Sequence, residues 1–440
     1  MNWERLISDK RLGMEEFHDR RIHIRSDFQR DYDRMIFSSP FRRLQNKTQV
    51  FPLPGSIFVH NRLTHSLEVS SVGRSMAREA WLLMRSRHDG RESGPALDKI
   101  PDIVAAACLC HDLGNPPFGH SGEKTISTWF SEGAGLRLRD DLTERQWCDF
   151  SRFEGNANSF RLLTHQFCGR RKGGFAMTYS TLASIVKYPW TSLHGGEKGK
   201  FGFFESEEED YRRVALELGI PELEEGVFAR HPLVYLMEAA DDICYQVMDI
   251  EDSHRLGILS TDEVKSLLLS FFGEKDRGRM ERAMGHLDDP NEQVGYLRSN
   301  AIGVMVGECA GVFADNEERM LAGERMPSLV SQMRPRLAEA YSRCSHIAWN
   351  RIYCASDVVD VDIAGNRIIT YLMDALMDAV LHPERNSSKL LLLKVPRQYD
   401  TGAASLYERL QSVLDHVSGM TDVYALDLFR KLNGHSLPAV

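Results

Sequence analysis

The chain has 440 residues, of which 42% are hydrophobic, and its formal net charge is −9. A chain of this length can bury a large core, and its acidic balance argues against a protein whose whole surface grips nucleic acid. The longest apolar run, 103–110, is far shorter than the roughly 20 residues of a membrane span, and the charged N-terminus resembles no signal peptide, so we expect a cytoplasmic protein without a membrane-spanning helix.

Hydrophobic periodicity predicts a mainly α-helical protein. Apolar residues recur at spacings of three and four in most segments, whereas strict alternation is scarce. A helical pattern over 27–50 ends at 51–55, where two prolines forbid helix and favour an extended loop. The next helix is expected to begin near Thr64. His65 lies at one end of its apolar stripe, so its side chain should point into the protein.

A second helix is predicted from Pro101 to Leu113. Proline suits the first turn of a helix, and we expect Gly114 to adopt the left-handed conformation that often ends one. The following residues, 115–117, include two prolines and exclude continuation. His111 and Asp112 therefore lie at a helix end.

A third helix is predicted around 233–249, where Asp241, Tyr245 and Asp249 follow at four-residue steps and so share one face. Before it, the Gly-rich, mixed-charge stretch 188–210 is typical of a mobile loop, and we expect a lid there. Beyond Gly257 the pattern stays helical, with breaks at 288–290, 326–327 and 382–383. No linker is long enough to separate a further domain.

Two histidines and two aspartates, His65, His111, Asp112 and Asp241, form a candidate metal site. Imidazole nitrogen and carboxylate oxygen suit borderline or hard divalent ions, and four such ligands leave positions free for water and a phosphate oxygen. Singly, each residue has a plainer interpretation: a lone inward histidine is usually a core residue, and adjacent aspartates often form a solvated stripe. The combination and its order favour a metal site.

These four residues, in this order on helices, resemble the pattern of HD-domain metal-dependent phosphohydrolases. Six longer segments are similar to bacterial deoxyguanosine triphosphate triphosphohydrolases: 30–53, 61–77, 111–123, 153–164, 236–245 and 416–426. Together they are distributed over most of the chain. A bare His-Asp doublet would be weak support, whereas several long segments in family order are specific.

The resemblance implies an all-α fold in which 1–440 form a single unit. Its HD metal-binding core covers about 40–260, and a C-terminal helical region, 261–440, packs on that core. It also implies hydrolysis of dGTP to deoxyguanosine and intact triphosphate, by attack of water at the α-phosphorus. The expected cofactor is a divalent ion held by the four ligands above, with Mn or Mg expected first and Fe, Co or Zn as alternatives.

The resemblance also assigns roles to further residues. His120 and Glu123 are three apart at a predicted helix start and resemble the family's catalytic dyad, in which the carboxylate fixes the imidazole tautomer; whether His120 acts as acid or base stays open, and its plainer interpretation is a capping residue. Gln49 resembles the residue that contacts the sugar 3′-hydroxyl, and Val50 would occupy the place of a ribose 2′-hydroxyl. The residues expected to line the phosphate pocket are Arg62, Asn115, Lys187, Tyr188, Tyr245 and Asp249.

Alternative functions remain open at this point. One is a broader dNTP triphosphohydrolase or another HD-domain nucleotidase or phosphodiesterase, and the base preference is not fixed by the sequence. Another is a non-catalytic module with a decayed site that binds nucleotides or single-stranded DNA. The presence of all the expected metal ligands argues against this alternative. Family resemblance further implies a homo-oligomer, a hexamer or tetramer, with a nucleotide or single-stranded DNA as allosteric effector.

Overall fold

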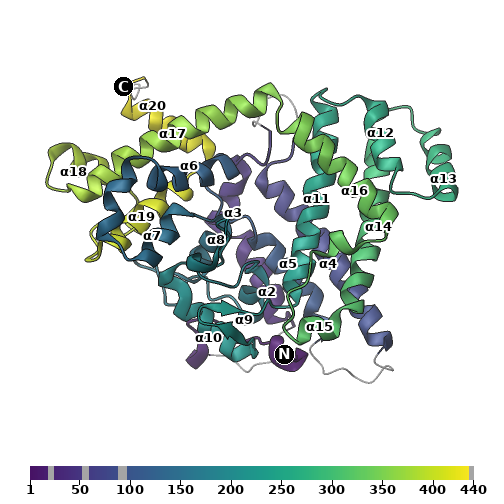
Figure 1. Cartoon of the computed structure of the whole chain (residues 1–440), viewed down its shortest axis with the longest axis horizontal. Coiled ribbons are helices and arrows are strands. Elements are labelled where there is room, and N and C mark those ends of the chain that lie inside the picture. Colours follow the sequence, from purple (N-terminus) through teal and green to yellow (C-terminus); the bar gives the residue numbers. More distant parts are fainter. Residues whose placement is uncertain (18–23, 52–58, 88–96, 436–440) are drawn as a thin grey trace.

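α-Helices dominate the computed structural model, which describes residues 1–17, 24–51, 59–87 and 97–435 (Figure 1). The all-α prediction is confirmed. The sheet found among these residues is a hairpin of β1 (Glu222–Glu224) and β2 (Val227–Phe228), paired antiparallel. No helix within the described ranges is long and apolar enough to cross a membrane. The two prolines expected to break the helix after residue 50 lie outside the described residues.

The first half of the chain contains α1 to α11. Their bounds are α1 Trp3–Leu6, α2 Asp27–Ile36, α3 Ser39–Arg43, α4 Arg62–Arg87, α5 Ile100–Cys110, α6 Gly119–Ser131, α7 Glu144–Ser151, α8 Gly155–Thr164, α9 Tyr179–Ile185, α10 Glu208–Leu218 and α11 Leu233–Arg255. Short 3-10 helices link several of them, at Glu15–Phe17, Leu44–Asn46, Leu97–Lys99, Ala134–Asp141, Ser192–His194 and Glu205–Glu207.

The second half is also helical. Its helices are α12 Thr261–Leu269, α13 Glu274–Met284, α14 Pro290–Asp315, α15 Glu317–Leu321, α16 Pro335–Ile347, α17 Ser356–Leu381, α18 Asn386–Leu392, α19 Leu406–Ser418 and α20 Asp422–Leu432, with a 3-10 turn at Leu329–Gln332 and a π-helical turn at Ala348–Ile352. The predicted breaks are confirmed: α14 begins at Pro290, 324–328 are not helical, and α17 ends at Leu381.

Helix α5 forms the centre of one hydrophobic cluster. Every residue from Ile103 to Cys110 is fully buried, and α5 packs against α4, α2, α9 and α11. An apolar sequence on all sides suits a helix covered on all sides. α14 closes this cluster by packing on α4 and α11. Because α5 is so enclosed, the residues just after its C-terminal end have fixed positions.

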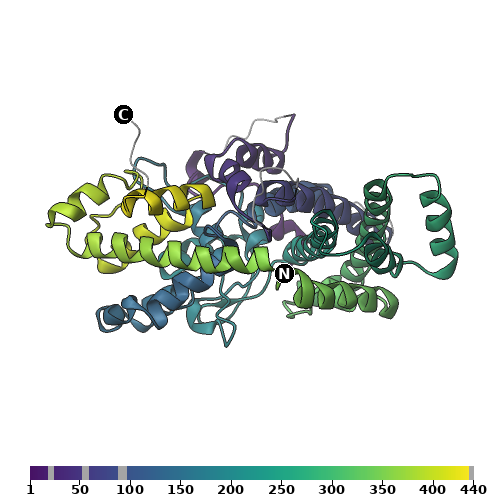
Figure 2. The ribbon, with the colours of Figure 1, turned by 90° about the horizontal axis from the view of Figure 1, so that it is seen from above.

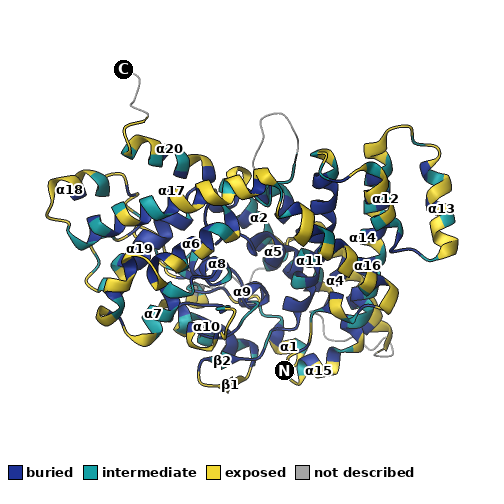
Figure 3. Ribbon diagram, turned by 45° about the horizontal axis from the view of Figure 1, so that its top comes forward, coloured by how far each residue is buried: buried dark blue, intermediate teal, exposed yellow. Residues whose placement is uncertain are grey.

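A second hydrophobic cluster joins the two halves of the chain. α17 runs lengthwise across the molecule and packs on α6, α18, α19 and α20 (Figure 2). Burial is greatest around α5, α8 and α9, while α13 and α18 carry much of the exposed surface (Figure 3). The C-terminal region therefore packs on the core at two places, through α14 and α16 on one side and through α17, α19 and α20 on the other.

A buried ion-pair cluster fixes α19 to the core. Arg161 of α8 donates to both carboxylate oxygens of Asp415, each at 2.8 Å, and to Glu207 at 2.5 Å. All three side chains are at most 4% exposed. Removing one partner of such a buried pair typically costs about 3–5 kcal/mol, because an uncompensated charge stays behind. The cluster therefore holds the segment 416–422 against the helix ends described below.

The mobile lid expected at 188–210 stays a prediction, because 196–198 are exposed but much of the segment is packed into the core. Phe201, Phe203 and Phe204 are fully buried, and Trp190 donates from Nε1 to the carbonyl of Lys200 at 2.7 Å. Burying three phenylalanines anchors the stretch, at about 1.5–3 kcal/mol for each side chain. Glycine content suggested mobility, whereas the aromatic residues between the glycines determine the conformation.

Candidate active site

α4 and α5 bring the first two histidines together. His65 lies in the first turns of α4 and is 1% exposed, and its ring centre is 5.4 Å from that of His111, at the end of α5. The Nδ1 atom of His111 donates to the carbonyl of Cys108 at 2.6 Å. Without an ion, burial opposes protonation of the ring, but Asp112 and Asp241 outweigh it and raise the pKa of His111 to about 9. Because Nδ1 is committed to this hydrogen bond, Nε2 is the atom that would bind a metal ion once its proton is displaced. Nε2 is buried and has no hydrogen-bond partner in the described structure.

Asp241, on α11, completes a compact cluster. Its Oδ1 atom lies 3.2 Å from Nε2 of His65 and 3.4 Å from Nε2 of His111, and its Oδ2 atom accepts from Lys187 at 3.4 Å. Burial acts to raise the pKa of Asp241, but His111 and Lys187 outweigh burial and hold that pKa well below its usual range. The carboxylate is therefore ionised, as a metal ligand must be.

His65, His111 and Asp241 fit a divalent metal ion. Their ligand atoms lie within 4.8 Å of one another. A ligating histidine usually donates its second ring N–H to a carbonyl or carboxylate, as His111 does. The unpaired Nε2 atom of His111, aimed at an ionised carboxylate, is explained by such an ion. The HD family is metal-dependent, and the identity of the ion stays a proposal.

Asp112 lies beside this cluster but is engaged differently. Its Oδ2 atom accepts from Arg62 at 2.8 Å and lies 3.6 Å from Nε2 of His111, while Oδ1 accepts from Asn115 at 2.5 Å. Burial opposes ionisation of Asp112, but Arg62 outweighs it and lowers the pKa to about 2. Its role as the fourth metal ligand stays a prediction. Arg62 and Asn115, predicted to bind phosphate, here hold the aspartate.

The turn that follows α5 has an unusual backbone. Gly114 does not have the positive φ we expected. Glycine is required at this position because a Cβ there would lie 2.1 Å from the amide nitrogen of Ser159. Positive φ occurs instead at Phe118 (61°) and Gly119 (59°). Near Gly119 an added Cβ would lie 2.5 Å from Nη2 of Arg62. The turn thus reverses direction through Phe118 and begins α6 next to Arg62.

His120 and Glu123 form the predicted pair on the first turn of α6. Nδ1 of His120 lies 2.9 Å from Oε2 of Glu123, and the other carboxylate oxygen accepts from the amide of Gly155 at 3.0 Å. The hydrogen bond to Glu123 raises the pKa of His120. Lys200 lies 4.0 Å from Glu123 and 2.5 Å from Glu154. The His120 side chain is 66% exposed, so its Nε2 edge is accessible to a substrate.

The remaining predicted residues lie around this centre. Gln49 is half-buried and its buried Oε1 atom has no hydrogen-bond partner in the described structure. Val50 packs against the first hydrophobic cluster. The ring of Tyr245 lies 6.4 Å from that of His65, and Tyr188 is half-buried next to Lys187. Asp249 lies one turn further along α11 from Tyr245, and burial raises its pKa to about 8.

Four further residues, which were not predicted from the sequence, shape the site. Tyr353 donates to Asp249 at 2.7 Å, and its ring centre lies 6.1 Å from that of Tyr245. Asp422 accepts from the amides of Thr48 and Phe118, at 2.7 and 3.0 Å.

The other two are lysines. Lys47 is 2% exposed and donates to the carbonyls of Asn115 and Ser418, at 2.6 and 2.7 Å. Lys200 lies beside Glu123, as described above. Asp422 falls inside the segment 416–426, whose resemblance signalled importance without giving a role; for Tyr353 no sequence signal was available.

Comparison with known proteins agrees with this geometry. Residues 62–190 match the HD domain, and residues 331–431 match the phosphohydrolase-associated domain. A Pseudomonas aeruginosa deoxyguanosinetriphosphate triphosphohydrolase-like protein is 38% identical over 455 residues, covering all of both chains. A protein of the same name from Synechocystis sp. is 38% identical, over 99% of this chain and all of its own.

A Yersinia enterocolitica deoxyguanosinetriphosphate triphosphohydrolase is 31% identical over 92% of this chain and 93% of its own. The matched HD region contains His65, His111, Asp112, His120 and Glu123, while Asp241 follows it on α11. Three helices thus bring together a candidate ion cluster, in a chain that aligns with these relatives over at least 92% of its length. The chain belongs to the deoxyguanosinetriphosphate triphosphohydrolase family of HD-domain phosphohydrolases.

Proposed function

We propose that this enzyme hydrolyses deoxynucleoside triphosphates, dGTP first among them, to the deoxynucleoside and inorganic triphosphate. The observation that carries the proposal is the position of the His120–Glu123 pair on the turn that leads directly from His111 and Asp112. A candidate proton-transfer group and a candidate ion site thus share one short segment. The names of the relatives support dGTP as substrate.

Phosphoryl transfer depends mainly on positioning and charge neutralisation. Two lysines supply positive charge near the site. Lys187, which was predicted, lies beside Asp241, and Lys200, which was not, lies beside Glu123. His65, His111 and Asp241, with Asp112 as proposed fourth ligand, would hold a divalent ion, which when bound would supply Lewis-acid polarisation of a phosphate oxygen and would lower the pKa of a bound water. We propose Mn or Mg for this ion.

His120 transfers a proton to or from one of the reacting oxygens, as a general acid or base. Glu123 keeps Nδ1 of His120 protonated. Nε2 is therefore the ring atom that accepts a proton from water or donates one to the leaving 5′-oxygen. Gly155, which donates to the same carboxylate, restrains Glu123 in this orientation.

The nucleoside would lie against Tyr245 and Tyr353, with Gln49 at the sugar. The Oε1 atom of Gln49 is buried and has no hydrogen-bond partner in the described structure, so a turn of its side-chain amide would let it accept from a substrate hydroxyl group, and Val50 follows it directly. A site that offers hydrogen bonds to one hydroxyl and an apolar group to the position of another discriminates between sugars. Deoxyribose preference is the expected result.

The test is a product analysis. The protein is incubated with each of the four dNTPs and with GTP, under Mn or Mg, and nucleoside and phosphate products are separated. We expect deoxyguanosine and intact triphosphate from dGTP. The variants His111→Ala and His120→Ala should lose activity, the latter by about 10²- to 10⁴-fold, whereas His286→Ala, in the exposed turn after α13, should not.

Other products would redirect the proposal. Triphosphate from all four dNTPs would indicate a broader dNTP triphosphohydrolase. Release of orthophosphate, pyrophosphate or a nucleoside monophosphate would favour another HD-domain nucleotidase or phosphodiesterase and refute the reaction proposed here.

A further inference from the structure

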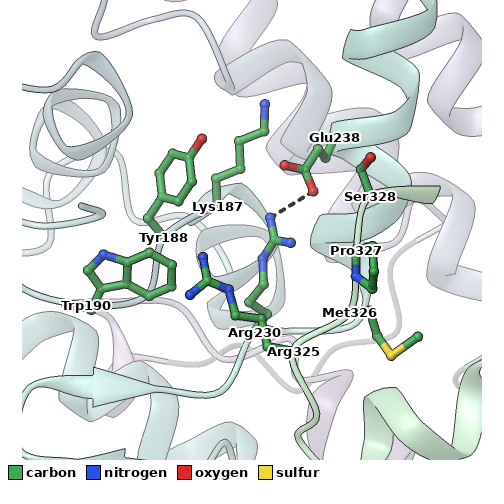
Figure 4. Close-up of a pocket in the computed structure, with 9 residues that line it drawn as sticks. All are labelled: Lys187, Tyr188, Trp190, Arg230, Glu238, Arg325, Met326, Pro327 and Ser328. Carbon is green, nitrogen blue, oxygen red and sulfur yellow. Dashed lines mark hydrogen bonds and ion pairs between the residues drawn. The ribbon is translucent and has the colours of Figure 1, made fainter. Parts of the chain in front are cut away.

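A pocket of about 380 Å³ opens beside Lys187, and Tyr188, Trp190 and Met326 supply apolar surface to its wall (Figure 4). This volume falls within the range of small-molecule sites, about 300–1,000 Å³. Its charged lining residues are Lys187, Arg230, Arg325 and Glu238, and Lys187 also pairs with Asp241 outside the lining, so the excess positive charge lies mainly at the two arginines. An anion is the ligand that such a lining favours.

Two aromatic rings hold the arginines in place. The guanidinium carbon of Arg230 lies 4.5 Å from the centre of the Tyr235 ring, and that of Arg325 lies 4.6 Å from the centre of the Trp190 ring. Stacking uses the flat face of a guanidinium and leaves its in-plane N–H groups free for a phosphate. Figure 4 shows the two guanidinium groups near the base of the Lys187 side chain, one against Glu238 and one beside Trp190, while the ammonium group of Lys187 points away from both.

Tyr235 also fixes the segment that carries Arg325. Its hydroxyl accepts from the amide of Met326 at 2.9 Å, so the same side chain organises Arg230 through its ring and the chain next to Arg325 through its oxygen. Trp190, under Arg325, is 8% exposed and tied to Lys200. The cations are thus pre-positioned, which lowers the entropic cost of binding a ligand.

The charges of the pocket are only partly compensated. Arg230 pairs with Glu238 at 2.9 Å, but its buried Nε atom has no hydrogen-bond partner in the part of the chain that the structure describes. For Arg325 the same ranges contain no ion pair. Lys187 connects the pocket to the reaction centre, since its Nζ atom lies 3.4 Å from Oδ2 of Asp241.

We propose that this pocket binds the distal phosphates of the substrate and then the inorganic triphosphate that leaves, with Arg325 and Arg230 as its phosphate-binding residues. The inference rests on the proposed function, because that reaction releases an intact triphosphate chain. The α-phosphate would remain near Asp241, and the chain would extend past Lys187 towards the two stacked arginines. A polyanion bound there leaves through the open side of the pocket.

The test is calorimetric titration of the full-length protein, without added metal, with orthophosphate, pyrophosphate and triphosphate. Affinity should increase along this series for the wild type. Arg325→Ala should weaken triphosphate binding by about 10- to 100-fold, the effect of losing a hydrogen bond to a charged group, and should weaken orthophosphate binding less, because a single phosphate can still bind at Arg230. Arg325 is exposed, so its removal should leave the fold intact.

Arg319→Ala is the matched control, because Arg319 is exposed and pairs with Glu324 outside the pocket. The control should bind triphosphate as the wild type does. In turnover, Arg325→Ala should raise KM for the dNTP and the inhibition constant of triphosphate together while leaving kcat nearly unchanged, since Arg325 acts on the phosphate tail.

Equal triphosphate affinity in the wild type and Arg325→Ala, or no binding to either, overturns the inference. These outcomes are separate from those of the product analysis. If the enzyme releases other products while Arg325 still governs triphosphate affinity, the reaction proposal fails and the site stands. If triphosphate is the product and Arg325→Ala is indistinguishable from the control, the reaction stands and the site is refuted.

Discussion

The imidazole of His120 lies 2.9 Å from the Glu123 carboxylate, from Nδ1 to Oε2, and this hydrogen bond raises the pKa of the histidine. The ring is exposed, whereas the Glu123 side chain is only 8% exposed and also accepts from Gly155. A fixed, buried carboxylate thus holds an accessible imidazole in one tautomer, an arrangement suited to proton transfer.

Glu123→Gln should therefore move the pH dependence of the reaction. Glutamine keeps the shape of the side chain but removes its charge, so the pKa of His120 should fall. The limb of the kcat/KM profile that reports His120 should shift to lower pH, whether that limb marks an acid or a base. Measurement of kcat/KM from pH 5 to 10 for both proteins checks this. An unshifted profile would show that His120 does not limit the reaction.

Gly119→Ala should lower activity through Arg62. The new methyl group would lie 2.5 Å from Nη2 of Arg62 and push the guanidinium away from Asp112. Losing this charged hydrogen bond corresponds to about 10-fold or more in rate. Gly169→Ala is the matched control, because Gly169 also has positive φ, 76°, but open space around it.

Both alanines adopt an unfavourable backbone conformation, at about 1–2 kcal/mol each, so both variants should unfold at lower temperature. Only Gly119→Ala should lose activity when both are assayed well below their unfolding temperatures. Equal activities would mean that Arg62 tolerates displacement.

Asp149→Asn should change the pH dependence of stability. Burial raises the pKa of Asp149 from 3.8 to about 7, and its Oδ2 atom accepts from Tyr407 and from the amide of Glu205. Asparagine can accept both hydrogen bonds without ionising. Because the folded-state pKa is raised, the protonated aspartate stabilises the protein fully below about pH 4, and this contribution is lost as the pH rises to 7.

The wild type should thus lose stability relative to Asp149→Asn as the pH rises from 5 to 7, by up to about 2.7 kcal/mol, at 1.36 kcal/mol for each pH unit. Denaturant unfolding at several pH values measures this difference. Asp140→Asn, at an exposed position, is the control and should follow the wild type. Parallel curves for Asp149→Asn and the wild type would refute the neutral carboxyl.

Gln49→Ala should lose dGTP hydrolysis by about 10-fold, the value of a hydrogen bond to a substrate hydroxyl, while gaining little GTP hydrolysis. Val50 still occupies the neighbouring position, so removing the amide frees no space for a 2′-hydroxyl. Measurement of kcat/KM for dGTP and for GTP checks this prediction. Gln45→Ala, at an exposed position of the same segment, is the control and should behave as the wild type does. Better turnover of GTP than of dGTP would contradict the assigned role.

Much of the helical framework could be predicted, because local chemistry determines it. Pro101 and the apolar run that follows form α5, and the prolines at 116 and 117 prevent its continuation, so His111 and Asp112 had to lie at its end. The inward direction of His65 follows from the apolar stripe of α4. The ion cluster itself follows only when three separate helices pack together, which the resemblance supplied and periodicity did not.

The features of the site that could not be predicted depend on contacts between residues far apart in the sequence. Asp422 joins residues 48 and 118 through backbone amides, and Tyr353 reaches Asp249, 104 positions away. No local pattern encodes such pairs. The wrong prediction for Gly114 has a similar origin: a glycine after a helix suggested a left-handed cap, whereas the requirement comes from the close approach of Ser159 on α8.

The most direct test of the proposed reaction is hydrolysis of dGTP in ¹⁸O-labelled water, with mass spectrometry of both products. Attack of water at the α-phosphorus predicts one ¹⁸O atom in the inorganic triphosphate and none in deoxyguanosine. Label in deoxyguanosine, or label in released orthophosphate or pyrophosphate, would contradict the account, because water would then have attacked a different atom.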